Sequence, residues 1–273
     1  MSEASSQYVS EYWSRDGLEQ AILNALVSEG HSLDALTIED LAPFDQFHGG
    51  GKGTTLRLAR LAELKPGMHV LDVGGGLGGP ARTLAAEFGC DVTVLDITES
   101  YLKTGEALTK RLGLADRVKH RLGNALQLPF DDTSFDVVWT QNSGMNIAAK
   151  RQLYTSFWRV LRPGGVLAFQ EPMAGSQTLV FPVMWADEAS SSFLKSTDEM
   201  RDLIERAGFR LRAWQDITAD IAGGGAVSRN SIQYLIMGER TDLILQNGRR
   251  NQEEGRVKYI LAVFVRPELQ LRA

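Results

Sequence analysis

Cysteine is nearly absent from this sequence: Cys90 is the only one among 273 residues. A single thiol excludes an internal disulfide framework and a metal site built from several cysteines. Long apolar runs are also missing, since none approaches the roughly 18 residues that a membrane-spanning helix needs. The first residues, MSEASSQYVSEYW, are polar, whereas a secretory signal begins with cationic and then apolar residues. We therefore expect a cytoplasmic protein with no membrane partner.

An excess of positive charge is missing as well, because the formal net charge is −5. Nucleic acid and anionic lipid repel such a chain overall, so neither is expected as a partner. Internal repeats and low-complexity linkers are absent too. With 43% apolar and 23% charged residues, the chain has the composition of an ordinary globular protein with one large core.

The predicted elements change character near residue 65. Before this point, GLEQAILNALVSEG and TTLRLARLAELKPG carry apolar residues at helical spacing. After it, short apolar runs such as HVLDVG, DVTVLDIT and FDVVWTQ alternate with amphipathic helical stretches, and KYILAVFVRP fits an antiparallel strand. We predict an N-terminal helical cap and lid in residues 1–65. Residues 66–273 then form a Rossmann-like α/β domain, with a doubly wound, mostly parallel sheet of seven strands whose last strand is antiparallel.

The stretch VLDVGGGLGGPARTLA, residues 70–85, places five glycines within six positions between a strand and a helix. In a sheet of this kind a ligand lies at the carboxyl ends of the strands, and the first strand-to-helix turn forms the floor of its site. Glycine lets a ligand reach backbone amides with no Cβ in the way. A purely structural turn is the weaker interpretation, because Pro80 opens a helix directly afterwards.

Two acids narrow the choice of ligand. Asp96 ends the next strand, 24 residues after Asp72, where a carboxylate can accept from both hydroxyls of a ribose. This position suits NAD and S-adenosylmethionine equally. Asp72 favours the second, because a carboxylate against the turn repels a pyrophosphate and attracts an ammonium and a sulfonium group. An NAD-dependent oxidoreductase is the alternative, although GGGLGG is not the spaced G-x-G-x-x-G fingerprint.

Four motifs in order carry a family resemblance: VLDVGGGLGGPARTLA, VTVLDIT, GNALQLPFDDTSFDVVW and RVLRPGG. The chain resembles class I S-adenosylmethionine-dependent methyltransferases, and most of all the small-molecule enzymes that methylate ubiquinone, tocopherol, sterols and dimethylglycine. The resemblance implies methyl transfer from S-adenosylmethionine to a small metabolite by in-line displacement. A scaffold that binds this cofactor without catalysis is a further alternative. The sequence also allows a homo-oligomer.

The resemblance implies a set of cofactor contacts. Asp96 would bind the ribose, Ile97 and Thr98 would lie against the adenine, and Asn124 with Ala125 would read the adenine amino group. Gln141 would touch the methionine part of the cofactor. The whole implied cofactor set is Asp72, Gly74, Gly75, Gly76, Gly78, Asp96, Ile97, Thr98, Asn124, Ala125 and Gln141.

Some acceptors need a general base and others, such as a neutral amine, do not. Two ionisable side chains are candidates for this role, His48 in FDQFHGGGKG and Glu171 in FQEPMAG. The three glycines after His48 suggest that residues 43–53 close over the site as a lid. A hydrogen-bonded structural histidine and a solvated glutamate are the plainer interpretations. No pair of His, Cys or carboxylate residues at ligand spacing flanks the motifs, so we expect no metal.

The acceptor pocket is expected under an insertion at about 172–197, after the fifth strand. Its sequence LVFPVMWADEASSSFL is apolar and carries Phe181, Met184, Trp185 and Phe193. An aromatic cap suits a sulfonium cofactor and an acceptor that is apolar or cationic. An enclosed pocket of this kind admits a metabolite rather than a protein tail or a duplex.

Overall fold

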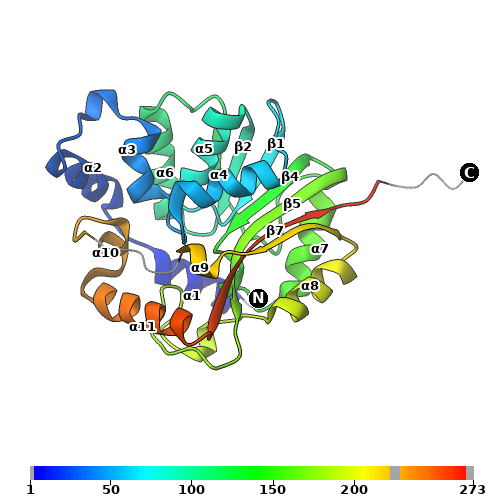
Figure 1. The fold of residues 1–273 in the computed structure, drawn as a ribbon. Helices are drawn as coiled ribbons and strands as arrows, with labels where there is room; N and C mark the ends of the chain where they lie inside the picture. The colour runs from blue at the N-terminus through cyan, green and yellow to red at the C-terminus, as the bar shows by residue number, and fades with distance from the viewer. Residues whose placement is uncertain (1–2, 222–227, 269–273) are drawn as a thin grey trace, which may run out of the picture.

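A seven-stranded sheet forms the centre of the computed structural model, which describes residues 3–221 and 228–268 (Figure 1). The strand order is β3-β2-β1-β4-β5-β7-β6, in which β7 is antiparallel to both of its neighbours and the other strands run parallel. The strands are β1 (His69–Val73), β2 (Asp91–Asp96), β3 (Val118–Leu122), β4 (Phe135–Gln141), β5 (Leu161–Ala174), β6 (Arg210–Asp216) and β7 (Val257–Val265). The predicted Rossmann-like, doubly wound fold is confirmed.

Both faces of the sheet are buried, as the apolar strand sequences predict. In β4, Val137 and Trp139 point into one core and Val138 points into the other. The first core is completed by α4 (Gly51–Leu61), α5 (Gly79–Phe88) and α6 (Glu99–Arg111). The second is completed by α7 (Lys150–Val160) and α8 (Thr197–Arg206). Helix α4, although it precedes residue 65, therefore belongs to the layer that covers the sheet.

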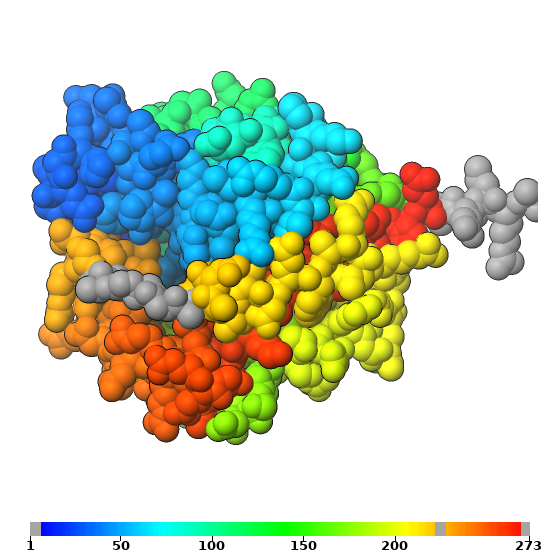
Figure 2. Space-filling model, in the orientation of Figure 1, coloured from blue at the N-terminus to red at the C-terminus, as the bar shows by residue number. Residues whose placement is uncertain are grey.

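A separate helical cap joins the two ends of the chain. The N-terminal helices are α1 (Glu3–Trp13), α2 (Leu18–Ser28) and α3 (Ile38–Asp45), and a short 3₁₀ turn η1 (Leu33–Ala35) separates the last two. They pack with α10 (Ile232–Met237) and α11 (Thr241–Glu253) in a third core that contains Ile22, Leu26, Ile236 and Ile244. Figure 2 shows the blue N-terminal and orange C-terminal segments side by side. No element is predicted from the sequence between residues 219 and 257, so this C-terminal half of the cap is seen only in the structure.

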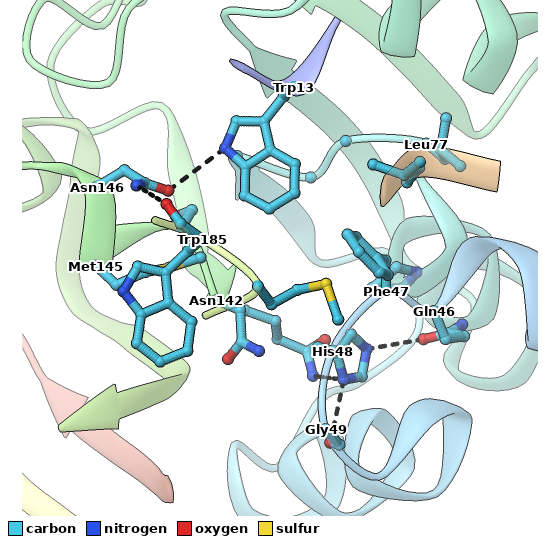
Figure 3. Close-up of a pocket in the computed structure, with 18 of the residues that line it drawn as sticks. Trp13, Gln46, Phe47, His48, Gly49, Leu77, Asn142, Met145, Asn146 and Trp185 are labelled. Carbon is cyan, nitrogen blue, oxygen red and sulfur yellow. Dashed lines mark hydrogen bonds between the residues drawn. The ribbon is translucent and has the colours of Figure 1, made fainter. Parts of the chain in front are cut away.

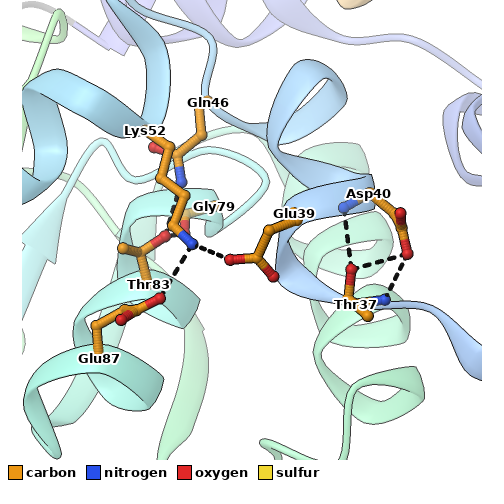
Figure 4. Close-up of polar contacts among 8 residues, drawn as sticks. All are labelled: Thr37, Glu39, Asp40, Gln46, Lys52, Gly79, Thr83 and Glu87. Atoms are coloured by element: carbon orange, nitrogen blue, oxygen red, sulfur yellow. Dashed lines mark hydrogen bonds and ion pairs between the residues drawn. The ribbon is translucent and has the colours of Figure 1, made fainter.

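Polar contacts fix the cap to the sheet layer at the start of α4. Lys52 Nζ lies 2.5 Å from Glu39 Oε1 on α3 and 3.0 Å from Glu87 Oε1 on α5 (Figure 4). Helix α3 begins with a capping box, in which Thr37 and Asp40 satisfy each other's backbone amides. The Gln46 side chain donates to Thr83 Oγ1 of α5. These contacts hold the connection between α3 and α4 against the helix that follows the glycine turn.

The connection from β5 to α8 is mostly irregular, with one short 3₁₀ turn, η3 (Ala189–Ser191). Shorter elements elsewhere are η2 (Gly144–Asn146), η4 (Gly238–Arg240) and α9 (Thr218–Ile221). None of the helices in the described ranges 3–221 and 228–268 is both long enough and apolar enough to cross a membrane.

Candidate active site

The glycine turn lies between β1 and α5 and has little room for side chains. Gly74 and Gly76 have φ of 70° and 53°, which favour glycine. A Cβ on Gly74 would lie 2.3 Å from Ser143 Cβ, and one on Gly75 would lie 2.6 Å from Asp72 Oδ2. The turn is therefore packed between the end of β1 and the segment after β4. Its amides are themselves engaged, because the Gly74 amide donates to the Leu95 carbonyl at 2.7 Å and the Gly76 amide donates to Asp96.

Asp96 at the end of β2 is anchored to this turn. Its Oδ2 accepts from the Gly76 amide at 2.9 Å and its Oδ1 accepts from the Thr98 amide at 2.8 Å. Burial raises the pKa of the carboxyl above its usual range, and the two amides act in the opposite direction. Each oxygen keeps a further lone pair, so the carboxylate can still accept from a ligand.

Asp72 is the less satisfied of the two acids. Its side chain is buried, and Oδ2 has no hydrogen-bond partner among the described residues. Burial, together with the nearby charge of Asp96, raises the pKa of Asp72 to about 8. A buried carboxyl group without a partner is costly, and a cationic ligand group would satisfy it.

Both acids line a cavity of about 560 Å³ at the carboxyl ends of the strands. This volume is within the range of small-molecule sites. One half of the cavity is formed by the glycine turn, the ends of β1 and β2, and the residues after β3. The other half is mainly apolar, and its side chains include Trp13, Phe47, Met145, Val183, Met184, Trp185, Ile236, Ile244 and Leu245.

Most of the implied cofactor residues are brought together at this cavity. They are Asp72, Gly74, Gly75, Gly76, Asp96, Ile97, Thr98, Asn124, Ala125 and Gln141. Gly78 is the exception, because its space is taken up by the sheet layer: a Cβ there would lie 3.0 Å from His120 Nε2 and 3.2 Å from an Arg82 guanidinium nitrogen. Gly78 instead caps α5 with a φ of 75°. Leu77 lines the cavity in its place.

His48 also lines the cavity, within a dense polar network. Its Nε2 lies 3.1 Å from Gln46 Oε1, and its Nδ1 lies 3.4 Å from Gln141 Nε2 (Figure 3). Nδ1 also lies 3.4 Å from the Gly49 carbonyl oxygen, and Nε2 lies 3.2 Å from Thr55 Oγ1, so donor and acceptor groups surround both ring nitrogens. Burial lowers the pKa of His48 to about 4, so the ring is neutral. The ring thus has partners on both sides.

Glu171 does not reach the cavity, contrary to the prediction that it points toward the acceptor. Its carboxylate is buried and accepts from the amides of Ser143 and Gly144, at 3.2 and 2.7 Å. The physical reason is that β5 continues to Ala174, which places Glu171 inside the strand rather than at its end. A direct proton transfer by Glu171 is therefore not proposed.

Several lining residues were missed because they come from segments without a motif. Trp13 of α1 donates to Asn146 Oδ1 at 3.4 Å, and its ring meets Phe47 edge to face at 5.9 Å between centroids (Figure 3). The Asn146 amide in turn donates to the Trp185 carbonyl at 2.8 Å. The aromatic residue at 13 and the SGMNI segment were visible signals, but their meeting depends on the cap. Phe181 and Phe193 of the insertion are not among the lining residues.

No group of three or more His, Cys, Asp and Glu side chains is placed to hold a metal ion within residues 3–221 and 228–268. Metal independence stays a prediction, to be tested by activity.

The sheet order, the glycine turn and the two strand-end acids together define the fold class of class I methyltransferases. The methyltransferase domain family matches residues 71–169. Methyltransferase GfsG of Streptomyces halstedii is 30% identical over 223 residues, which cover 80% of this chain and 78% of that protein. This chain belongs to the family of S-adenosylmethionine-dependent methyltransferases.

Two further comparisons bear on the fold and on the extent of the likeness. Squalene methyltransferase 1 of Botryococcus braunii is 40% identical over 115 residues, 42% of this chain but only 30% of that protein. Geranyl diphosphate C-methyltransferase from Streptomyces coelicolor A3(2) was solved with Mg²⁺, geranyl-S-thiolodiphosphate and S-adenosylhomocysteine. It superposes with a TM-score of 0.73 at 18% identity over 97% of this chain and 99% of that one, which shows a shared fold. The alternatives of an NAD-dependent oxidoreductase and of a non-catalytic scaffold find no support in these relatives.

The cofactor of this family fits the residues present. The unpartnered Oδ2 of Asp72 offers an anion to the ammonium group, and the bare backbone of the turn leaves room beside it. No basic side chain lies among the residues of the glycine turn, as would suit a phosphate-bearing ligand.

Proposed function

We propose that this protein transfers a methyl group from S-adenosylmethionine to a small, mainly apolar acceptor. The observation that carries the proposal is that one cavity has two different ends. At one end lies buried Asp72, whose Oδ2 has no hydrogen-bond partner among the described residues, and at the other a wall of mainly aromatic and aliphatic side chains. S-adenosylmethionine, when bound, supplies a methyl group made electrophilic by its sulfonium. The chain's own residues then need to bind, align and exclude water.

The cofactor end of the cavity has a residue for each polar part of S-adenosylmethionine. Asp72 would pair with the ammonium group, and Asp96 would accept from the ribose hydroxyls while the Gly76 amide holds it in place. Ile97, Thr98, Asn124 and Ala125 would surround the adenine. The proposal rests on their position around the same cavity and on the family to which the chain belongs.

We infer that His48 orders the site rather than accepting a proton. Its neutral ring joins Gln46, before α4, to Gln141 at the end of β4, and Gln141 also donates to Gln170 at 2.9 Å. Because both ring nitrogens already have hydrogen-bond partners, the ring is poorly placed to accept a further proton. It instead fixes the separation of the Gln46 and Gln141 side chains. Acceptors that react without a base, or that carry their own acidity, fit this arrangement better.

The acceptor end favours an apolar molecule. Among the described lining residues the carboxylates Asp45, Asp72 and Asp96 belong to the turn side. The acceptor side offers Trp13, Trp185 and their aliphatic neighbours, together with the polar residues Gln233, Arg249, Asn251 and Gln252 of α10 and α11. Burial of hydrocarbon against such a wall is worth about 25 cal/mol per Å². The relatives named for squalene and geranyl diphosphate act on isoprenoid chains, which we take as the first acceptors to test.

The test is release of S-adenosylhomocysteine with defined acceptors. We expect turnover with at least one neutral isoprenoid, such as squalene or geraniol, and little with dimethylglycine. Equilibrium binding of S-adenosylmethionine and of NAD to the same preparation provides the control, and only the first should bind. Tight cofactor binding without product from any acceptor would favour the scaffold, and preference for dimethylglycine would overturn the apolar assignment.

A further inference from the structure

The segment after β4, residues 142–146, connects the two halves of the cavity, and we call it the 142–146 strap. Four of its five members line the cavity: Asn142, Ser143, Met145 and Asn146. Ser143 lies against Gly74 of the glycine turn, while Asn146 contacts Trp13 of the cap. The strap thus touches the cofactor side with one residue and the acceptor side with another.

The strap has an unfavourable backbone that something must hold. Asn142 has a φ of 53°, and its side-chain Oδ1 is buried without a partner among the described residues. Asparagine adopts this left-handed region more readily than other non-glycine residues, and the conformation persists where its surroundings fix it.

Two buried charged side chains form hydrogen bonds to the strap at Gly144. The Glu171 carboxylate on β5 accepts from the Gly144 amide at 2.7 Å and from the Ser143 amide at 3.2 Å. Lys150 at the start of α7 is 4% exposed, and its ammonium donates to the Gly144 carbonyl. The anion therefore holds the N–H of Gly144, and the cation holds its C=O.

The fit around Gly144 is close. A Cβ at this position would lie 2.9 Å from Glu171 Oε1, so only glycine allows the carboxylate to approach. The charges of Lys150 and Glu171 influence each other: burial lowers the pKa of Lys150 to about 8, and Glu171 opposes that shift. A buried charge is costly unless it has a partner. Here Glu171 and Lys150 each have a hydrogen-bond partner on the strap, and each charge also stabilises the other.

We propose that Lys150 and Glu171 act together as positioning residues that clamp the Gly144 peptide and so set the 142–146 strap between cofactor and acceptor. Neither side chain lines the cavity. Both act through the strap. The inference rests on the proposed function for its meaning in catalysis, whereas the clamp itself can be measured without an acceptor.

The test is a double-mutant cycle on Lys150→Met and Glu171→Gln, with S-adenosylhomocysteine as the probe. Each single variant leaves one buried charge uncompensated, so we expect about tenfold weaker binding and about tenfold faster hydrogen exchange in residues 142–146. The double variant removes both charges at once. Its loss of affinity should stay near tenfold and not reach the hundredfold of independent effects.

Asp136→Asn is the matched control. Asp136 also joins a backbone amide, that of His69 at 2.8 Å, to a cation, Arg162 at 2.5 Å, but at the opposite ends of the same strands. It should lower the melting temperature and leave affinity and strap exchange unchanged. If a charge variant fails to fold, Gly144→Ala separates strap and carboxylate with both charges kept and should show the same two effects.

Additive losses in the cycle, or normal strap exchange in all variants, would overturn the clamp. If the wild-type protein does not bind S-adenosylhomocysteine, the proposed function fails instead. The exchange rates of residues 142–146 without ligand then still decide whether Lys150 and Glu171 hold the strap.

Discussion

At the scale of single residues, Asp72 and Asp96 occupy equivalent places but differ in their partners. Asp96 is held by the amides of Gly76 and Thr98, whereas Asp72 Oδ2 has none in the part of the chain that the structure describes. Because two amides fix the Asp96 carboxylate, it can orient a neutral ribose hydroxyl. A carboxyl group without a partner responds to charge, so the two acids should fail in different ways when they are changed.

Asp96→Ala removes the acceptor for the ribose hydroxyls and leaves two backbone amides without their partner. Each charge-assisted hydrogen bond contributes about 1.5–3 kcal/mol, so the affinity for S-adenosylmethionine should fall at least about tenfold in calorimetry. Asp91→Ala, at the exposed first residue of the same strand, is the control. An unchanged dissociation constant in Asp96→Ala would remove this residue from the site.

Asp72 should make cofactor binding depend on pH. With a pKa of about 8, raised by burial and by Asp96, the group is protonated at pH 6 and must lose its proton to pair with an ammonium. Affinity should therefore rise by up to about tenfold per pH unit from pH 6 to pH 8 and level off above. Asp72→Asn should bind weakly and with little pH dependence, as measured by titration in buffers of one ionic strength. A wild-type curve that is flat, or that falls with pH, would contradict this.

Two predicted site residues, Gly78 and Glu171, do not line the cavity, for two different reasons. Gly78 is the N-cap of α5, whereas the direction of the Glu171 side chain depends on where β5 ends. Because β5 extends past Glu171, the carboxylate meets the strap amides instead of the cavity. The cofactor residues were predictable because they lie at strand ends and in a turn whose geometry is fixed locally.

At the scale of elements, the expected lid over residues 43–53 is shorter than its glycines suggest. Phe44 lies in the last turn of α3, and Gly51 and Gly53 lie in the first turn of α4. Only residues 46–50 therefore connect the two helices. On binding of S-adenosylhomocysteine, hydrogen exchange should slow in residues 46–50 and change less in the helical residues on either side. Equal rates of hydrogen exchange with and without ligand would show that residues 46–50 do not move on binding, which would contradict the lid.

His48→Ala tests the same element by kinetics. The substitution removes a spacer between Gln46 and Gln141 without touching the acids, so turnover should fall more than cofactor affinity. The measurement compares the rate at saturating cofactor with the dissociation constant of S-adenosylhomocysteine. Equal losses in both would place His48 in cofactor binding alone.

Two asparagines attach helix α11 to the segment after β5: Asn247, whose Nδ2 donates to the Pro182 carbonyl at 3.0 Å, and Asn251. Asn251 Oδ1 accepts from the Val180 amide at 2.8 Å, and its Nδ2 donates to the Val180 carbonyl at 3.0 Å. Asn251→Ala leaves two part-buried backbone groups without these partners, so the free energy of unfolding should fall by about 1–3 kcal/mol. Gln246→Ala, an exposed position on the same helix, should change it by less than about 0.5 kcal/mol in urea denaturation.

At the scale of the whole molecule, the order of elements followed from the sequence and the closing of the cavity did not. Alternating apolar runs and amphipathic stretches predict the α/β sheet because each element buries its own face. The third core, which joins Leu26 to Ile236 and Ile244, forms between segments about 200 residues apart. No local period predicts such a meeting, so the part of the apolar wall that the cap helices supply could be placed only by the structure, whereas Met184 and Trp185 of the insertion were predicted from the sequence.

The chemistry of the whole site is expected to need no divalent metal. Methyl transfer here relies on alignment and on exclusion of water by the cap, and residues 3–221 with 228–268 offer no metal-holding group. Activity should survive excess EDTA unchanged. Loss with EDTA and recovery with magnesium would point to an acceptor that brings its own metal, such as a diphosphate.

The place of β7 has a consequence for the order of events during synthesis. This strand is the last element of the described residues 3–221 and 228–268, yet it lies between β5 and β6 and buries Leu261, Ala262, Val263 and Phe264. Chains fold from the N-terminus as they are made, so β5 and β6 leave the ribosome with unpaired edges and wait for it. A stop codon that removes only residues 257–273 should therefore yield an insoluble product. Translation must therefore reach Val265 before the sheet can close between β5 and β6.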